Sequence, residues 1–202
     1  MATVTRTQSV VIAVLGALVL NAFVLSPFWI LAPAEEFSDT ASVPAFGWAQ
    51  GISWFLLTLL IPLVPALVHA GQRGTPPAWV VPLVQIALAL QAVSHYVQGF
   101  VLTWLTPQAP EIVNATDGGM LQVSMFGIWV FFMVAMIVFA ITLWRAGHSR
   151  VGAVLMILGA ISTPAIGSFG AGLLALGLLI ITVLSLRSRA ALPEAEPASA
   201  MA

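Results

Sequence analysis

The sequence predicts an all-α integral membrane protein: a six-transmembrane-helix bundle with N- and C-termini cytoplasmic. Two features of its composition predict the class. Of 202 residues, 60% are hydrophobic and only 6% are charged, whereas soluble domains carry about 25% charged residues. A third feature, the placement of the arginines, predicts how often the chain crosses the membrane and in which direction.

Apolar runs long enough to cross a bilayer divide the chain into spans. A membrane-spanning helix needs about 20 mostly apolar residues, and the first such run is too long for a signal-peptide core, so we expect it to be retained. The last apolar stretch, 151–186, is interrupted by Pro164 and several glycines, and it forms either one over-long helix or a tight pair. The predicted spans are 9–31, 48–69, 78–105, 121–144, 151–166 and 171–187.

The arginines decide between five and six spans. With six spans and a cytoplasmic N-terminus, every basic residue falls on the cytoplasmic side, as the positive-inside bias requires. With five spans, Arg187 and Arg189 would lie outside. The acidic residues of the loops fall on the opposite side, and tryptophans mark both membrane borders. The basic residues are Arg6, Arg73, Arg145, Arg150, Arg187 and Arg189.

The fifth and sixth spans are expected to be short and closely packed. At about 16 residues each they cover ~24 Å, less than the ~30 Å of a hydrocarbon core. Local thinning, close packing or a re-entrant hairpin would each resolve this mismatch. Small residues on both spans, among them Gly159, Gly170 and Gly177, predict close approach of the two backbones.

Two segments are expected to depart from straight helices. Pro62 and Pro65 predict a kink near the inner end of the second span. The tail 188–202 is rich in alanine, proline and glutamate, and we expect it to be a disordered cytoplasmic tail. Residues 1–187 then form a single transmembrane domain.

Formal charge is absent from the predicted membrane cores, where the titratable side chains are His95 and Tyr96. Proton- and ion-coupled transporters usually hold an intramembrane carboxylate or cation, so this absence argues against that class. Other polar residues follow helical spacing on the third span. Gln91, then Ser94 or His95, then Gln98 lie on one face of that helix.

Depth estimates bring polar residues of other spans to a similar level. At 1.5 Å per residue, Gln91 lies about 20 Å and His95 about 25 Å from the cytoplasmic edge, and Asn21 lies about 18 Å from it. Thr58, near the middle of the second span, completes a polar layer. The candidate ligand-binding residues are Asn21, Thr58, Gln91, Ser94, His95 and Gln98.

Two interpretations of this polar layer stay open, and a redox role is a third. The groups either hydrogen-bond between helices and fix the bundle, at about 0.6 kcal/mol per bond, or they line a cavity for a small polar ligand or an amphipathic head group. His69 and His148 lie roughly 25 Å below His95. They cannot share one haem iron with it.

The leading functional prediction is a small, non-enzymatic polytopic membrane protein. It would bind a ligand or partner, or act as a subunit of a larger membrane assembly or homo-oligomer. The alternative is a transporter or carrier of a small neutral or amphipathic solute, which would use the polar layer. A second alternative is a quinone- or haem-linked redox protein.

Several classes of cofactor and partner find no support in the sequence. Cysteine is absent, no metal-ligand cluster or phosphate-binding motif stands out, and we expect no metal or cofactor. The net charge of −1 predicts no nucleic-acid partner.

The lipid bilayer is the expected environment. Abundant alanine, valine, glycine and leucine, with no lysine, favour a bacterial source and a multi-pass location in the inner membrane.

Overall fold

The computed structural model describes residues 6–30, 36–69, 76–115 and 119–190. Within these ranges the only regular structure is helix, which confirms the all-α prediction. The elements are α1 (Arg6–Ile30), α2 (Phe37–Ala41), α3 (Pro44–Leu60), η1 (Ile61–Leu63), α4 (Val64–His69), α5 (Val80–Tyr96), η2 (Val97–Leu102), α6 (Thr103–Leu105), α7 (Pro110–Ala115), α8 (Met120–Arg145), α9 (Arg150–Ile166) and α10 (Ser168–Ala190).

Five helical units among the described residues are long and apolar enough to cross a membrane. They are α1, α3 with its continuation through α4, α5 with its continuation through α6, α8, and α10. On length and composition, the chain is a multi-pass membrane protein. Helix α9 has 17 residues. It is therefore about 25 Å long.

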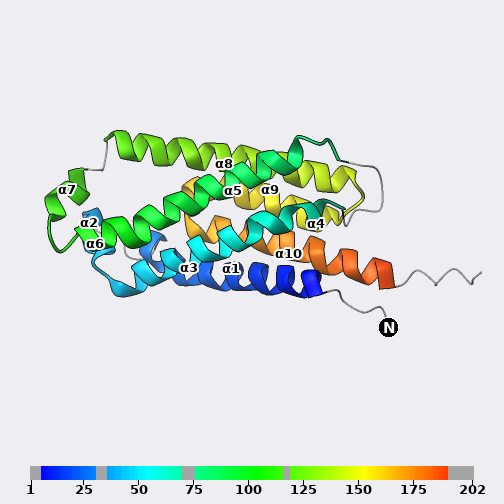
Figure 1. Ribbon diagram of the computed structural model, residues 1–202, viewed down its shortest axis with the longest axis horizontal. Helices are drawn as coiled ribbons and strands as arrows, with labels where there is room; N and C mark the ends of the chain where they lie inside the picture. Colours follow the sequence, from blue (N-terminus) through cyan, green and yellow to red (C-terminus); the bar gives the residue numbers. More distant parts are fainter. Residues whose placement is uncertain (1–5, 31–35, 70–75, 116–118, 191–202) are drawn as a thin grey trace, which may run out of the picture.

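The long helices form a closed ring (Figure 1). Helix α1 packs on α3, α3 on α5, α5 on α8, α8 on α9 and α9 on α10, and α10 returns to α1. Successive helices run in opposite directions, so α1 begins and α10 ends at the same end of the bundle (Figure 1). We call this the arginine end, because Arg6, Arg145 and Arg150 lie at helix termini there.

The opposite end carries the described loop carboxylates and two short helices, α2 and α7, that pack on each other. The backbone N–H of Ser38 donates to Asn114 Oδ1 at 2.9 Å, and Asn114 Nδ2 donates to the carboxylate of Glu36. Val113 of α7 is fully buried. The two loops are thus tied together across the end of the ring, which we call the acidic end.

Helices α9 and α10 form an antiparallel hairpin with closely packed backbones. Gly167 makes the turn with a φ of 53°, a conformation that favours glycine. A Cβ atom added to Gly159 would lie 2.4 Å from the backbone nitrogen of Leu174, and one added to Gly177 would lie 2.5 Å from the carbonyl oxygen of Gly152. Glycine is therefore required for the close approach that the sequence predicts.

The last helix is longer than the sequence predicts. Helix α10 has 23 residues and extends from Ser168 to Ala190, so it begins before the expected span 171–187 and ends after it. The glycines at its start do not interrupt it, because Gly170 lies against α9 and Gly172 against Ala22 of α1, where packing replaces helix propensity. Residues 191–202, most of the predicted tail, lie outside the described residues.

The second long helix is interrupted near the prolines, as expected. The short 3₁₀ turn η1 contains Pro62, and α4 follows it. Pro65 has no N–H to donate to the carbonyl oxygen of Ile61, four residues earlier. The backbone N–H of Val64 donates to that carbonyl, and Gln85 Nε2 of α5 donates to it as well, at 3.1 Å. The side chain of Gln85 thereby connects α5 to the turn that follows α3.

Candidate functional site

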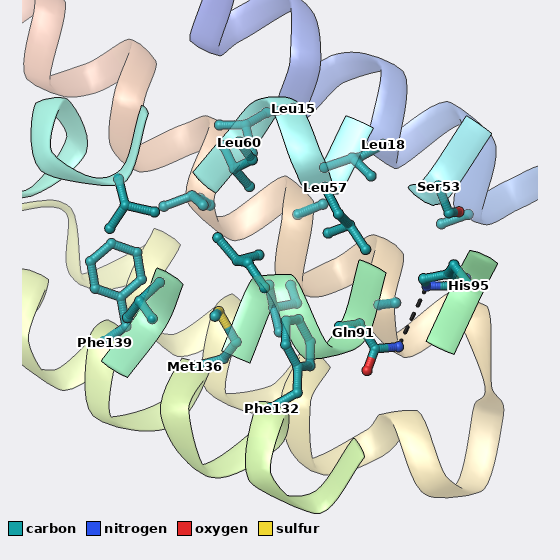
Figure 2. A pocket seen from close by; sticks show the side chains of 18 of the residues that line it. Leu15, Leu18, Ser53, Leu57, Leu60, Gln91, His95, Phe132, Met136 and Phe139 are labelled. Carbon is teal, nitrogen blue, oxygen red and sulfur yellow. Dashed lines mark hydrogen bonds between the residues drawn. The ribbon is translucent and has the colours of Figure 1, made fainter. Parts of the chain in front are cut away.

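A cavity of about 90 Å³ lies inside the ring (Figure 2). It is several times larger than the about 10–15 Å³ that a single water molecule needs. Side chains from α1, α3, α4, α5, α8 and α10 line it. Along α10 it extends from Ser168 to Leu178, which is roughly 15 Å of helix. The cavity is therefore long and slim.

Most of the lining is aliphatic or aromatic. Leu15, Leu57, Leu60, Met136 and Phe139 are among the side chains that enclose its apolar part (Figure 2). Polar side chains gather toward the acidic end, where Ser53, Gln91, His95 and Ser168 contribute to the wall. No charged side chain is among the described residues that line the cavity.

Gln91 and His95 meet one helical turn apart on α5, at the polar end of the cavity (Figure 2). Gln91 Nε2 lies 3.4 Å from His95 Nε2. His95 Nδ1 is hydrogen-bonded to Gln50 Oε1 of α3. Gln91 Oε1 is buried, and it has no hydrogen-bond partner in the described structure. A buried acceptor without a donor carries an uncompensated desolvation cost of about 1–3 kcal/mol.

Gln50 connects His95 to a second pair of polar side chains. Its Nε2 donates to Gln98 Oε1 at 2.9 Å, and Gln98 Nε2 donates to Ser94 Oγ at 3.3 Å. Only 1% of the surface of Gln50 is exposed. The side chain of Gln50 is therefore the link through which the polar residues of α5 and η2 form one network.

Asn21 joins the same region from α1. Its Nδ2 donates to the carbonyl oxygen of Ala49 at 2.8 Å and to Ser53 Oγ at 2.7 Å. Asn21 is buried, with 6% of its surface exposed. It holds α1 against α3 and uses both amide hydrogens to do so. Ser53, which lines the cavity, accepts one of them.

A π-helical turn and a glycine bring η2 close enough to α3 for this network to form. The turn η2 follows directly after Tyr96 and contains Gln98 and Gly99. A Cβ atom added to Gly99 would lie 2.8 Å from the Cβ of Gln50, closer than packed side chains tolerate. Such π-helical turns often occur at functional sites, and here the turn places Gln98 opposite Gln50.

The structure brings together five of the six residues that the sequence selects. Gln91, Ser94, His95 and Gln98 belong to the network around Gln50, and Asn21 lies beside it through Ser53. Thr58 is exposed on the outer surface of α3, where its hydroxyl donates to the carbonyl oxygen of Trp54. The structure does not bring Thr58 to this group.

Sequence reasoning missed Gln50 and Ser53. They lie one turn apart on α3, close to the start of the predicted span, where polar side chains normally reach the headgroup region. The signal that would have found them is their spacing, because Gln50, Ser53 and Leu57 follow the i, i+3, i+7 pattern of one helical face.

The environment of His95 bears on the haem alternative. One ring nitrogen bonds to Gln50 and the other faces Gln91 Nε2. Axial ligation of iron needs a free lone pair on one of these nitrogens. Binding of haem through His95 would therefore require that Gln91 or Gln50 first move away.

Comparison with known protein families, with curated proteins and with solved structures found no match to this chain.

Proposed function

We propose that this chain is a six-span membrane protein that binds a neutral amphiphile with one slim apolar tail inside its helical ring. The polar head would lie beside Gln91 and His95, and the tail would extend toward the arginine end among the leucines and phenylalanines. The observation that carries the proposal is Gln91 Oε1, a buried acceptor without a partner at the polar end of an otherwise apolar cavity.

The chemistry of the wall supports a neutral ligand. A charged head group taken out of water needs a charged or strongly hydrogen-bonding partner, and the described lining offers neutral amides, an imidazole and hydroxyls. A small polar solute would fill the polar end alone and leave the apolar part empty. An amphiphile matches both parts, because each section of the cavity then contacts ligand atoms of its own kind.

The slim shape of the cavity supports a single chain as the tail. A volume of about 90 Å³ is smaller than the roughly 150 Å³ of a cavity that admits a benzene ring, so a fused-ring system does not fit. A single alkyl or isoprenoid chain follows the roughly 15 Å length of the lining and requires only that side chains of the wall move aside. Haem and other broad cofactors would need the helices to separate. This argument favours a lipid-binding protein over the redox alternative.

The proposed topology has six spans, with the arginine end in the cytoplasm. The hairpin supports the sixth span, because α9 returns the chain to the acidic end before α10 begins. A helix of about 25 Å crosses a core of ~30 Å with modest local thinning. The positive-inside bias supports the orientation, since arginines and carboxylates gather at opposite ends.

Binding of labelled amphiphiles to the purified protein tests the proposal. Tritiated 1-dodecanol and 2-dodecanone are equilibrated with the protein in nanodiscs, with Leu57→Trp as the variant that fills the cavity. Leu57 lines the cavity and is 7% exposed, whereas Leu59 on the same helix is 38% exposed. Leu59→Trp therefore makes the same chemical change on the outer surface and serves as the matched control.

We expect saturable binding of at least one of the two compounds to the wild type and to Leu59→Trp. Leu57→Trp should weaken it by about tenfold or more, because an indole in the cavity displaces the tail. Equal binding to both tryptophan variants, or no saturable binding to the wild type, would contradict the proposal.

A further inference from the structure

The polar side chains at the cavity form one continuous hydrogen-bonded chain that ends at Gln91. In order, its members are Ser94, Gln98, Gln50, His95 and Gln91. They come from α3, α5 and η2, and each contacts the next through a side-chain nitrogen or oxygen. Because every amide has one donor end and one acceptor end, such a chain has a direction.

The direction is set at Gln50. Its Nε2 donates to Gln98, so its Oε1 is the atom that faces His95. A carbonyl oxygen only accepts, and His95 Nδ1 must therefore carry the proton of the neutral ring. His95 Nε2 is then the acceptor and receives the amide hydrogen of Gln91. Gln91 consequently turns its Oε1 away from His95.

This arrangement leaves an acceptor, and not a donor, at the end of the chain. Gln91 lines the cavity, and its Oε1 is buried and without a partner in the described structure. The acceptor cannot be satisfied within the chain unless the amides and the imidazole all reverse together. The hydroxyl of Ser94 can donate as well as accept, so the reversed order would also be complete and would turn Gln91 Nε2 toward the cavity. In the order that the structure shows, Gln98 donates to Ser94 and the end that faces the cavity is an acceptor.

We infer that the head group is a hydrogen-bond donor, a neutral hydroxyl on a long apolar chain. This inference rests on the proposed function and names the ligand class. A hydroxyl gives Gln91 Oε1 the hydrogen that it lacks. A ketone, quinone or ether would place a second acceptor against it, which leaves two buried acceptors unpaired. The site thus selects alcohols against carbonyl compounds and ethers of the same length.

Binding constants for three matched ligands test this selectivity. The ligands are 1-dodecanol, its methyl ether, and 2-dodecanone, each equilibrated with the wild-type protein in nanodiscs. We expect the alcohol to bind about tenfold more tightly than either of the others, which corresponds to one hydrogen bond that only the alcohol makes. This comparison needs no variant and does not depend on how well a variant folds.

Two variants locate the selectivity at Gln91. Gln91→Met has nearly the same shape but lacks the acceptor, and we expect the alcohol and its ether to bind it equally. Gln108→Met makes the same change at an exposed glutamine between α6 and α7, and it should keep the wild-type preference. Circular dichroism checks that both variants are folded.

The outcomes separate this inference from the proposed function. Preference of the wild type for the ketone would mean that the chain runs in the opposite direction, and it would overturn the donor inference while ligand binding stands. Equal affinity for the alcohol and the ether in the wild type would overturn it too. If none of the three compounds binds, both the inference and the proposed function fail.

Discussion

At the scale of single residues, the interior contains amides and hydroxyls that satisfy one another almost completely. Gln50 is the clearest example, because it is nearly fully buried and bonds to both His95 and Gln98. Leaving such groups unpaired in an apolar interior is costly. The network therefore fixes how α5 and η2 are rotated against α3, and it leaves one acceptor at the cavity.

Removal of the amide of Gln50 should destabilise the fold. Gln50→Met keeps the shape of the side chain but leaves His95 Nδ1 and Gln98 Oε1 without a partner. We expect the free energy of unfolding to fall by about 1–2 kcal/mol. This value lies between the about 0.6 kcal/mol of an average interhelical hydrogen bond in a membrane and the about 1–3 kcal/mol cost of an unpaired buried polar group. Thermal unfolding followed by circular dichroism measures it, with Gln108→Met as the control. Equal melting temperatures for the two variants would show that the network contributes nothing.

The spacing of polar residues on the third span could be predicted from the sequence, and the position of Thr58 could not. Gln91, His95 and Gln98 share one face at the spacing of an α-helix, so their grouping follows from periodicity. Thr58 depends on how α3 is rotated. That helix is apolar on its outer face as well, with exposed residues such as Phe55 and Leu59. The hydrophobic pattern therefore does not distinguish its two faces.

At the scale of elements, glycine packing holds the hairpin of α9 and α10 together. Gly159→Ala places a methyl group 2.4 Å from the backbone nitrogen of Leu174, a position that the backbone can relieve only by separating the helices. We expect a destabilisation of about 1–3 kcal/mol, measured by thermal unfolding.

Gly127 of α8 gives the matched control, because a Cβ atom added there meets nothing within 4 Å. Gly127→Ala should be neutral or stabilise the protein by up to about 1 kcal/mol, since alanine favours the helix over glycine. If Gly159→Ala behaves like Gly127→Ala, the hairpin is packed less closely than the structure indicates.

The helix interruptions were only partly predictable. Proline marks the break at Pro62, because the missing N–H is visible in the sequence itself. The π-helical turn at η2 carries no such mark. It depends on the approach of Gly99 to Gln50, a contact between residues far apart in the chain. Single-sequence patterns report local preferences and do not report such contacts.

At the scale of the whole molecule, opposite charges gather at opposite ends of the ring, and this separation predicts the orientation. The absence of cysteine allows a direct test with single-cysteine variants and a membrane-impermeant maleimide on intact cells. We expect labelling of Gln108→Cys at the acidic end and protection of Ala78→Cys at the arginine end.

Ala165→Cys, at the exposed end of α9, tests whether the hairpin crosses completely. It should be labelled from outside like Gln108→Cys if α9 spans the membrane. Protection of this variant in intact cells would indicate a re-entrant hairpin, and labelling of Ala78→Cys would reverse the orientation.

Native mass spectrometry of the purified protein tests the central claim most directly, because it detects an amphiphile that the ring has taken from the membrane. The account predicts a bound molecule of defined mass on the wild type and on Leu59→Trp, and its loss from Leu57→Trp. The same adducts on all three proteins would place the molecule on the outer surface and would contradict a ligand held within the ring.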